Sequence, residues 1–203
     1  MKNLAALVVM FLFSFSAASA QTLTAAERAR AVSHLEATRD AFLKSLDTLS
    51  DEQWNWKSAP ERWSVAESAE HIVLSEDLIY QLITERILKS PAAPEKKEEV
   101  RGKDDAVLKM IPDRSQKFQA PEAIQPKHTN ASREEIVKRF KESRVRLIEF
   151  VQNSQEDLRS HFGEHPVMKL LDAYQWVLLD SAHCERHTKQ IAEVKADAGF
   201  PKK

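Results

Sequence analysis

The sequence contains little glycine and a single cysteine. Only 3 of its 203 residues are glycine, whereas sheets with tight turns usually need more, and residues that favour helices are plentiful. Cys184 has no second cysteine in the chain, so no internal disulfide can form and the fold must depend on its core. We interpret Cys184 as either a buried small residue or a free thiol. Both scarcities favour a helical domain held together by apolar packing.

An excess of charge of one sign is also absent. Lysine and arginine number 30 and aspartate and glutamate 31, which gives a net charge of −1. Binding to nucleic acid ordinarily requires a basic surface, so we expect no nucleic-acid partner. The length of 203 residues and the 42% hydrophobic content suit one domain with a substantial core, and we find neither repeats nor a second domain.

Long apolar runs are missing except near the N-terminus. Lys2 gives a short positive start, residues 4–15 are apolar, and Ala18-Ser19-Ala20 matches an A-x-A cleavage site. This pattern predicts a secretory signal peptide over residues 1–20, export to the periplasm or the exterior, and a mature domain over residues 21–203. An uncleaved anchor is the alternative, but the run is shorter than the about 20 residues that a membrane span requires. We therefore expect no membrane span in the mature chain.

Four segments show the periodicity of amphipathic helices. They cover residues 24–49, 64–89, 132–153 and 169–196. Capping boxes at Ser64 and Ser132 mark two of the helix starts. Residues 90–131 contain five prolines and little periodicity, apart from a short helical stretch over residues 104–110. We predict an all-α four-helix bundle with a long crossover between helices 2 and 3, of the kind that serves as a lid, a connection or a flexible segment.

Two histidines lie one turn apart on the last of these helices. His183 and His187 are spaced i and i+4, so both imidazoles project from one face and can reach one ion. At about 100° per residue, Trp176 and Leu179 share that face, so the pair points toward the core. Two buried histidines without a metal would each need other partners. On spacing alone, a solvated histidine pair remains the alternative.

His71 is the third histidine with an inward position. It shares a stripe of the second helix with Leu78, and alone it would more often be a satisfied core histidine than a ligand. Helical bundles, however, build metal sites from inward side chains of facing helices. Together His71, His183 and His187 supply three nitrogens and leave coordination positions open, as catalytic sites do. We predict a site for one divalent metal ion, and zinc, nickel, iron, manganese and copper all remain open.

The residues around these histidines allow further predictions. Glu185 stands two positions from His183, about 200° around the helix, so it cannot serve as the base of an H-E-x-x-H metalloprotease. Asp180 and Glu67 each precede a predicted ligand by one turn and are candidates to orient it. The alternatives are a solvated side chain for Asp180 and a helix cap for Glu67.

The other histidines are expected at the surface: His34, His128, His161 and His165. The tryptophans are interpreted as packing residues: Trp54, Trp56, Trp63 and Trp176.

Two motifs are similar to those of the DinB-like superfamily. Residues 172–191 resemble its final-helix signature, and residues 63–72 resemble its second-helix motif. The resemblance implies a four-helix bundle with a metal-binding histidine triad, which falls on His71, His183 and His187. Some relatives transfer thiol cofactors such as bacillithiol, mycothiol or glutathione, others are metal-dependent hydrolases, and many pair as homodimers. Membership of such a family implies a site better than it implies a reaction.

Three hypotheses for function follow. The first is an exported metal-dependent enzyme, hydrolase-like or thiol-transferase-like, in which residues 90–131 cover a small-molecule substrate. The predicted export argues against thiol transfer, because cytoplasmic thiol cofactors are scarce beyond the membrane. The second is a non-enzymatic module that binds a metal or small ligand, since no base for catalysis is recognisable. The third is a scaffold with degenerate site residues.

Overall fold

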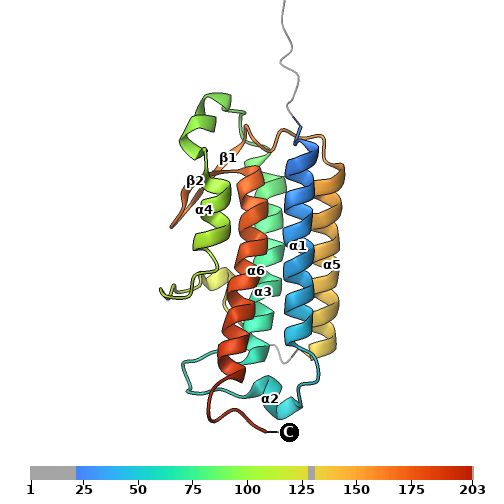
Figure 1. Ribbon diagram of the computed structural model, residues 1–203, viewed down its shortest axis with the longest axis vertical. Helices are drawn as coiled ribbons and strands as arrows, with labels where there is room; N and C mark the ends of the chain where they lie inside the picture. Colours follow the sequence, from blue (N-terminus) through green and yellow to red (C-terminus); the bar gives the residue numbers. More distant parts are fainter. Residues whose placement is uncertain (1–21, 128–130, 203) are drawn as a thin grey trace, which may run out of the picture.

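Four long helices run side by side and form the body of the molecule (Figure 1). The computed structural model describes residues 22–127 and 131–202, so the predicted signal peptide lies outside the described residues. The bundle helices are α1 (Ala25–Ser45), α3 (Val65–Gln81), α5 (Arg133–Asn153) and α6 (Ala173–Lys195). Helices α1 and α6 run in one direction and α3 and α5 in the other, and each of α1 and α3 packs against both α5 and α6. The predicted all-α four-helix bundle is confirmed.

Each bundle helix begins at a residue whose side chain caps the first turn. The caps of α1, α3, α5 and α6 are Thr24, Ser64, Ser132 and Asp172. The capping box predicted at Ser64 forms as expected: its hydroxyl accepts a hydrogen bond from the Glu67 amide at 3.1 Å, and Glu67 accepts one from the Ser64 amide at 2.8 Å. Such boxes satisfy backbone amides that lack partners inside the helix. They therefore set where α3 and α6, which carry the three histidines, begin.

A short β-hairpin precedes α6 and corrects the predicted start of that helix. Strands β1 (Phe162–His165) and β2 (Lys169–Asp172) pair antiparallel, with Phe162 opposite Asp172. Residues 169–172 were expected to be helical as the start of the segment 169–196. The expectation was wrong because Asp172 has extended backbone and caps α6, and a four-residue strand is too short to show its own periodicity.

Helix α3 continues as a π-helical turn, η1 (Leu82–Ile87), against which the hairpin packs. The Leu88 amide donates to the Ile83 carbonyl at 3.0 Å, the five-residue spacing of a π-helix. Gly163 of β1 lies so close to η1 that a Cβ atom there would be 2.7 Å from Ile87 Cδ1. The glycine thus permits the close approach of the hairpin to the bundle.

The long crossover is docked on the bundle. Its short helices are η2 (Pro94–Val100), α4 (Lys103–Met110) and η3 (Glu122–Ile124), while α2 (Asp51–Asn55) lies in the earlier connection between α1 and α3. The helix expected over residues 104–110 is confirmed. Helix α4 packs on α6, and η3 packs on α3. Arg186 of α6 donates hydrogen bonds to the carbonyls of Ile111 at 3.2 Å and Gln116 at 2.6 Å, which tie the crossover to the helix bearing two of the histidines.

A charged cluster lies within the otherwise apolar core. Arg144 of α5 is fully buried and hydrogen-bonds Glu76 of α3, and its guanidinium lies 3.4 Å from the carboxylate of Asp180 on α6. Ser143 also donates to Glu76 at 3.1 Å. Three helices are therefore joined through one guanidinium. Among the described residues, no helix has the length and apolar character needed to cross a membrane.

Candidate metal centre

The three histidines predicted from the sequence meet between α3 and α6. One ring nitrogen from each of His71, His183 and His187 lies within 4.8 Å of the other two, a spacing that could hold a metal ion. His71 and His187 are 1% and 8% exposed, and His183, taken as a whole residue, is partly buried. The inward direction deduced from the helical stripes is confirmed. The cluster is thus largely enclosed by the bundle.

His71 is held in one tautomer by the crossover. Its Nδ1 lies 2.6 Å from the carbonyl oxygen of Ile124 in η3. A carbonyl can only accept a hydrogen bond, so Nδ1 must carry the proton. In a neutral imidazole the other nitrogen, Nε2, then presents a lone pair. The crossover contact thereby leaves His71 Nε2 able to bind a cation.

His187 is held in the same tautomer by a different partner. Its Nδ1 lies 2.9 Å from Oε1 of Gln190, one turn further along α6. Arg114 Nη1 donates to that same oxygen at 3.2 Å, and because a guanidinium can only donate, the amide presents its oxygen on this side. His187 Nδ1 therefore carries its proton, and its Nε2 also presents a lone pair.

The two lone pairs face each other. His71 Nε2 and His187 Nε2 are 3.1 Å apart, and with both protons on Nδ1 neither nitrogen can donate to the other. Two nitrogens bound to one zinc ion at about 2.0 Å and roughly tetrahedral angles lie about 3.3 Å apart. The observed separation is close to that value. The pair could therefore bind one cation together.

Burial makes protonation of the three histidines unfavourable. Burial lowers the pKa of His71 to about 4, although its bond to the Ile124 carbonyl acts in the opposite direction. Burial, and then the neighbouring imidazoles, also lower the pKa of His187 well below its ordinary value. The pKa of His183 is lowered in the same way, first by burial. All three rings are consequently neutral near pH 7, the form in which histidine binds metals.

Trp63 covers one side of the histidine cluster. Its ring centroid lies 4.8 Å from that of His71 and 6.0 Å from that of His187. Trp63 was interpreted as a packing residue, and it does pack, but against two candidate ligands. An aromatic ring here limits the access of water and restricts rotation of both imidazoles.

The acidic neighbours behave differently from one another. Glu185 is 42% exposed and pairs with Lys189 at 2.7 Å, so the prediction that it faces away from the histidines is confirmed. Glu67 caps α3 and pairs with Lys57 at 3.0 Å, in agreement with the helix-cap alternative. Asp180 is 1% exposed and lies beside Arg144, so the solvated alternative was wrong. Burial, rather than sequence spacing, decides each of these roles.

Arg144 was not singled out from the sequence. It follows Phe140 by four residues and precedes Leu147 by three, which places it on the apolar stripe of α5. A charged residue in that register was the signal that could have identified it. Cys184 lies near this arginine, and burial raises the pKa of its thiol well above the ordinary value. The buried-residue interpretation of Cys184 is thus confirmed.

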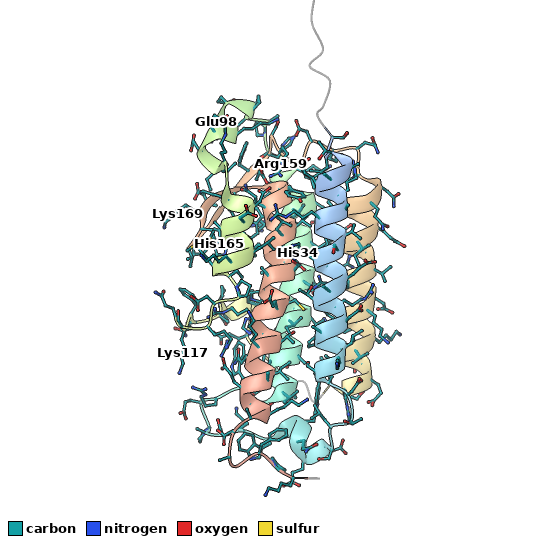
Figure 2. All side chains as sticks on the ribbon, in the orientation of Figure 1. His34, Glu98, Lys117, Arg159, His165 and Lys169 are labelled. Atoms are coloured by element: carbon teal, nitrogen blue, oxygen red, sulfur yellow. The ribbon has the colours of Figure 1, made fainter. Side chains whose placement is uncertain are left out.

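His165 is the other histidine whose environment differs from expectation. It was expected at the surface, but the hairpin brings its ring centroid to 5.4 Å from that of Trp176, and burial lowers its pKa. It lies on the hairpin side of the bundle, whereas His34 lies on α1 (Figure 2). The amides of Val167 and Met168 donate to His165 Nδ1 at 3.2 and 3.0 Å, so Nε2 carries the proton. His128 lies outside the described residues.

Comparison with known proteins agrees with these features. A model of the DinB superfamily matches residues 34–191, a range that includes all three histidines of the cluster. The chain belongs to the DinB superfamily. It is 26% identical over 150 residues to the uncharacterised protein YuaE of Bacillus subtilis strain 168, across 74% of this chain and 88% of that relative. No solved structure gives a significant match.

Proposed function

We propose that this DinB-superfamily protein is an exported, metal-dependent enzyme that acts on a small molecule at His71, His183 and His187. The observation that carries the proposal is the pair of Nε2 atoms that face each other at 3.1 Å while both Nδ1 atoms are committed as donors. Neutral imidazoles in this arrangement repel each other, whereas a divalent cation between them binds both.

Under this proposal, some residues bind the ion and others orient those ligands. The three imidazoles hold the ion, and the Ile124 carbonyl and the Gln190 amide keep two of them in the tautomer that binds it. Three protein ligands leave coordination positions for a substrate. When bound, the ion supplies a Lewis acid that polarises a coordinated group and lowers its pKa. His183 is the least buried residue of the three, so we place the substrate on its side.

His165 is the candidate to donate a hydrogen bond to the substrate on the His183 side. Its ring packs against Trp176, which shares the inward face of α6 with His183. With Nδ1 occupied by two backbone amides, only Nε2–H is free to donate to a bound molecule. We assign it the role of a hydrogen-bond donor to the substrate.

The reaction class follows from chemistry and location together. We favour a hydrolase-like reaction over thiol transfer, because thiol cofactors are scarce outside the cytoplasm and residues 1–20 carry the pattern of an export signal. The three-nitrogen ligand set suits zinc, nickel, iron or manganese. Each of these metals should therefore be used for reconstitution. A homodimer, common among relatives, is part of the proposal only as a state to be measured.

The test is metal-dependent turnover. Residues 21–203, reconstituted with each metal, would be assayed against ester, phosphoester and amide substrates and against thiol-transfer probes, beside His183→Ala and His165→Phe. We expect turnover that His183→Ala abolishes and His165→Phe reduces. Stoichiometric metal without any turnover would favour the non-enzymatic binding module, and turnover unaffected by His183→Ala would refute the site.

A further inference from the structure

Gln190 and Arg114 are linked to the histidine cluster by hydrogen bonds although neither is a candidate ligand. We propose that Arg114 is a positioning residue: it sets which end of the Gln190 amide faces His187, and thereby keeps His187 in the tautomer that binds a metal. The inference rests on the proposed function, since it assumes that the cluster holds a metal ion. It extends the site from α3 and α6 to the crossover that carries Arg114.

Arg114 is itself fixed in place. Its Nε and Nη2 donate to the two carboxylate oxygens of Glu193 at 2.6 and 2.8 Å, a bidentate pair that defines the plane of the guanidinium. These bonds also lower the pKa of Glu193, so the carboxylate stays charged near pH 7. The remaining Nη1 is then directed at Gln190 Oε1, 3.2 Å away. The side chain is only 16% exposed, which limits competition from water.

The Gln190 amide could in principle face His187 in two ways. With its oxygen toward His187, it accepts from Nδ1–H and leaves a lone pair on Nε2. With its NH₂ toward His187, it would donate to Nδ1, and the proton of the ring would move to Nε2, the atom that faces His71. A protonated Nε2 cannot bind a metal. The orientation of one amide therefore decides whether His187 is a ligand.

Arg114 selects between these orientations because it can only donate. The observed orientation lets Gln190 Oε1 accept from both Arg114 and His187. The flipped orientation would direct an NH₂ group at a guanidinium, lose the bond from Arg114 and require the His187 proton to move to Nε2. The same crossover supplies the Ile124 carbonyl that orients His71, so docking of residues 111–124 fixes the tautomers of two of the three rings.

The test replaces the Gln190 amide with a carboxylate, whose two oxygens are both hydrogen-bond acceptors. Four proteins would be compared at pH 7.5: wild type, Arg114→Met, Gln190→Glu, and the double variant. Zinc dissociation constants would be measured by competition with a chromophoric chelator. In the Gln190 background we expect Arg114→Met to weaken zinc binding about 10-fold or more, the usual effect of losing a residue that orients a ligand. In the Gln190→Glu background we expect no weakening, since either carboxylate oxygen accepts from His187 Nδ1–H.

Other roles for Arg114 predict other patterns. If its positive charge acted only through space, its removal would strengthen zinc binding in both backgrounds. If it merely held the crossover in place, its removal would weaken binding in both. Either result would overturn the positioning role. Arg146→Met is the matched control, because it removes a similar ion pair, to Asp77 at 2.7 Å, on the outer face of α5 and should leave zinc binding unchanged.

The same measurements separate this inference from the proposed function. Wild-type protein that binds no zinc, nickel, iron or manganese would overturn both. Wild-type protein that binds zinc tightly, with equal effects of Arg114→Met in the two backgrounds, would overturn the positioning role alone.

Discussion

Two polar clusters lie in the core of the bundle, and burial affects them in opposite ways. The arginine cluster consists of Arg144, Glu76 and Asp180, and it contains its own cation. The histidine cluster consists of three bases, and Nε2 of His71 and Nε2 of His187 face each other 3.1 Å apart. Buried polar groups cost free energy unless they are paired. The first cluster receives its cation from the chain itself, although neither Asp180 oxygen has a hydrogen-bond partner among the described residues, and the second has a spacing that could hold a metal ion.

The two clusters also differ in the direction in which burial shifts their pKa values. In the arginine cluster, burial raises the pKa of both Glu76 and Asp180, that of Asp180 well above its ordinary value, so folding favours a proton on this cluster. In the histidine cluster, burial lowers the pKa of all three rings. A proton therefore helps to neutralise the first cluster and is excluded from the second. The difference suits the first cluster to a structural role and agrees with the predicted metal site at the second.

Removal of the internal cation should have the largest effect. Arg144→Met leaves Glu76 buried without its partner and breaks the contact to Asp180, so the free energy of unfolding should fall by about 3 to 5 kcal/mol. Urea unfolding of the metal-free protein measures this. Arg146→Met, which removes a partly exposed ion pair, should cost less than about 1 kcal/mol. Equal losses in the two variants would mean that burial of the arginine cluster contributes nothing special.

Acid should destabilise the metal-free protein through His71. Its pKa is about 4 when folded and near 6.5 in the unfolded chain, so between these values the unfolded state binds more protons. Stability from this group is therefore present above pH 6.5 and is lost as the pH falls toward 4, by about 3 kcal/mol in all. Urea unfolding from pH 4.5 to 7.5 measures the slope.

His71→Asn isolates that contribution. An asparagine can still donate to the Ile124 carbonyl but does not titrate. Asp172 has its pKa raised to about 6, so its stabilising contribution is lost as the pH rises, and it affects both proteins equally. The wild type should lose more stability than the variant on acidification, and parallel pH profiles would contradict the account.

Zinc binding should stabilise the protein. Free zinc at about 100 times its dissociation constant should raise the free energy of unfolding by about 2.7 kcal/mol, because it binds the folded state. Thermal denaturation with and without zinc reveals the effect. His187→Ala should show no comparable increase, since it removes one of the two facing nitrogens. A similar increase in that variant would place the bound zinc elsewhere.

The smallest effect is expected at Asp180. Because burial raises the pKa of Asp180 well above its ordinary value, ionising this carboxyl group in the folded protein costs stability that asparagine would not lose. Asp180→Asn should therefore raise the free energy of unfolding by on the order of 1 kcal/mol at pH 7. A loss comparable to that of Arg144→Met would instead show that Asp180 is ionised and required by the arginine.

Much of this could be predicted from the sequence, for identifiable reasons. The i and i+4 spacing of His183 and His187 and the inward stripe of His71 are local features of helices, and the bundle preserves them. The hairpin was missed because its strands are four residues long. The Ile124 contact to His71 joins residues 53 positions apart. It involves a crossover without periodicity, so no sequence pattern predicts it. Export and the ligand role of the histidines stay predictions.

Metal content is the measurement that tests the central claim most directly. Residues 21–203 would be purified from the periplasm without a chelating tag, beside His187→Ala, and both analysed by elemental mass spectrometry. The account predicts about one divalent ion per wild-type chain and almost none in the variant. Equal metal content in the two proteins, or none in either after reconstitution with zinc, nickel, iron and manganese, would contradict it.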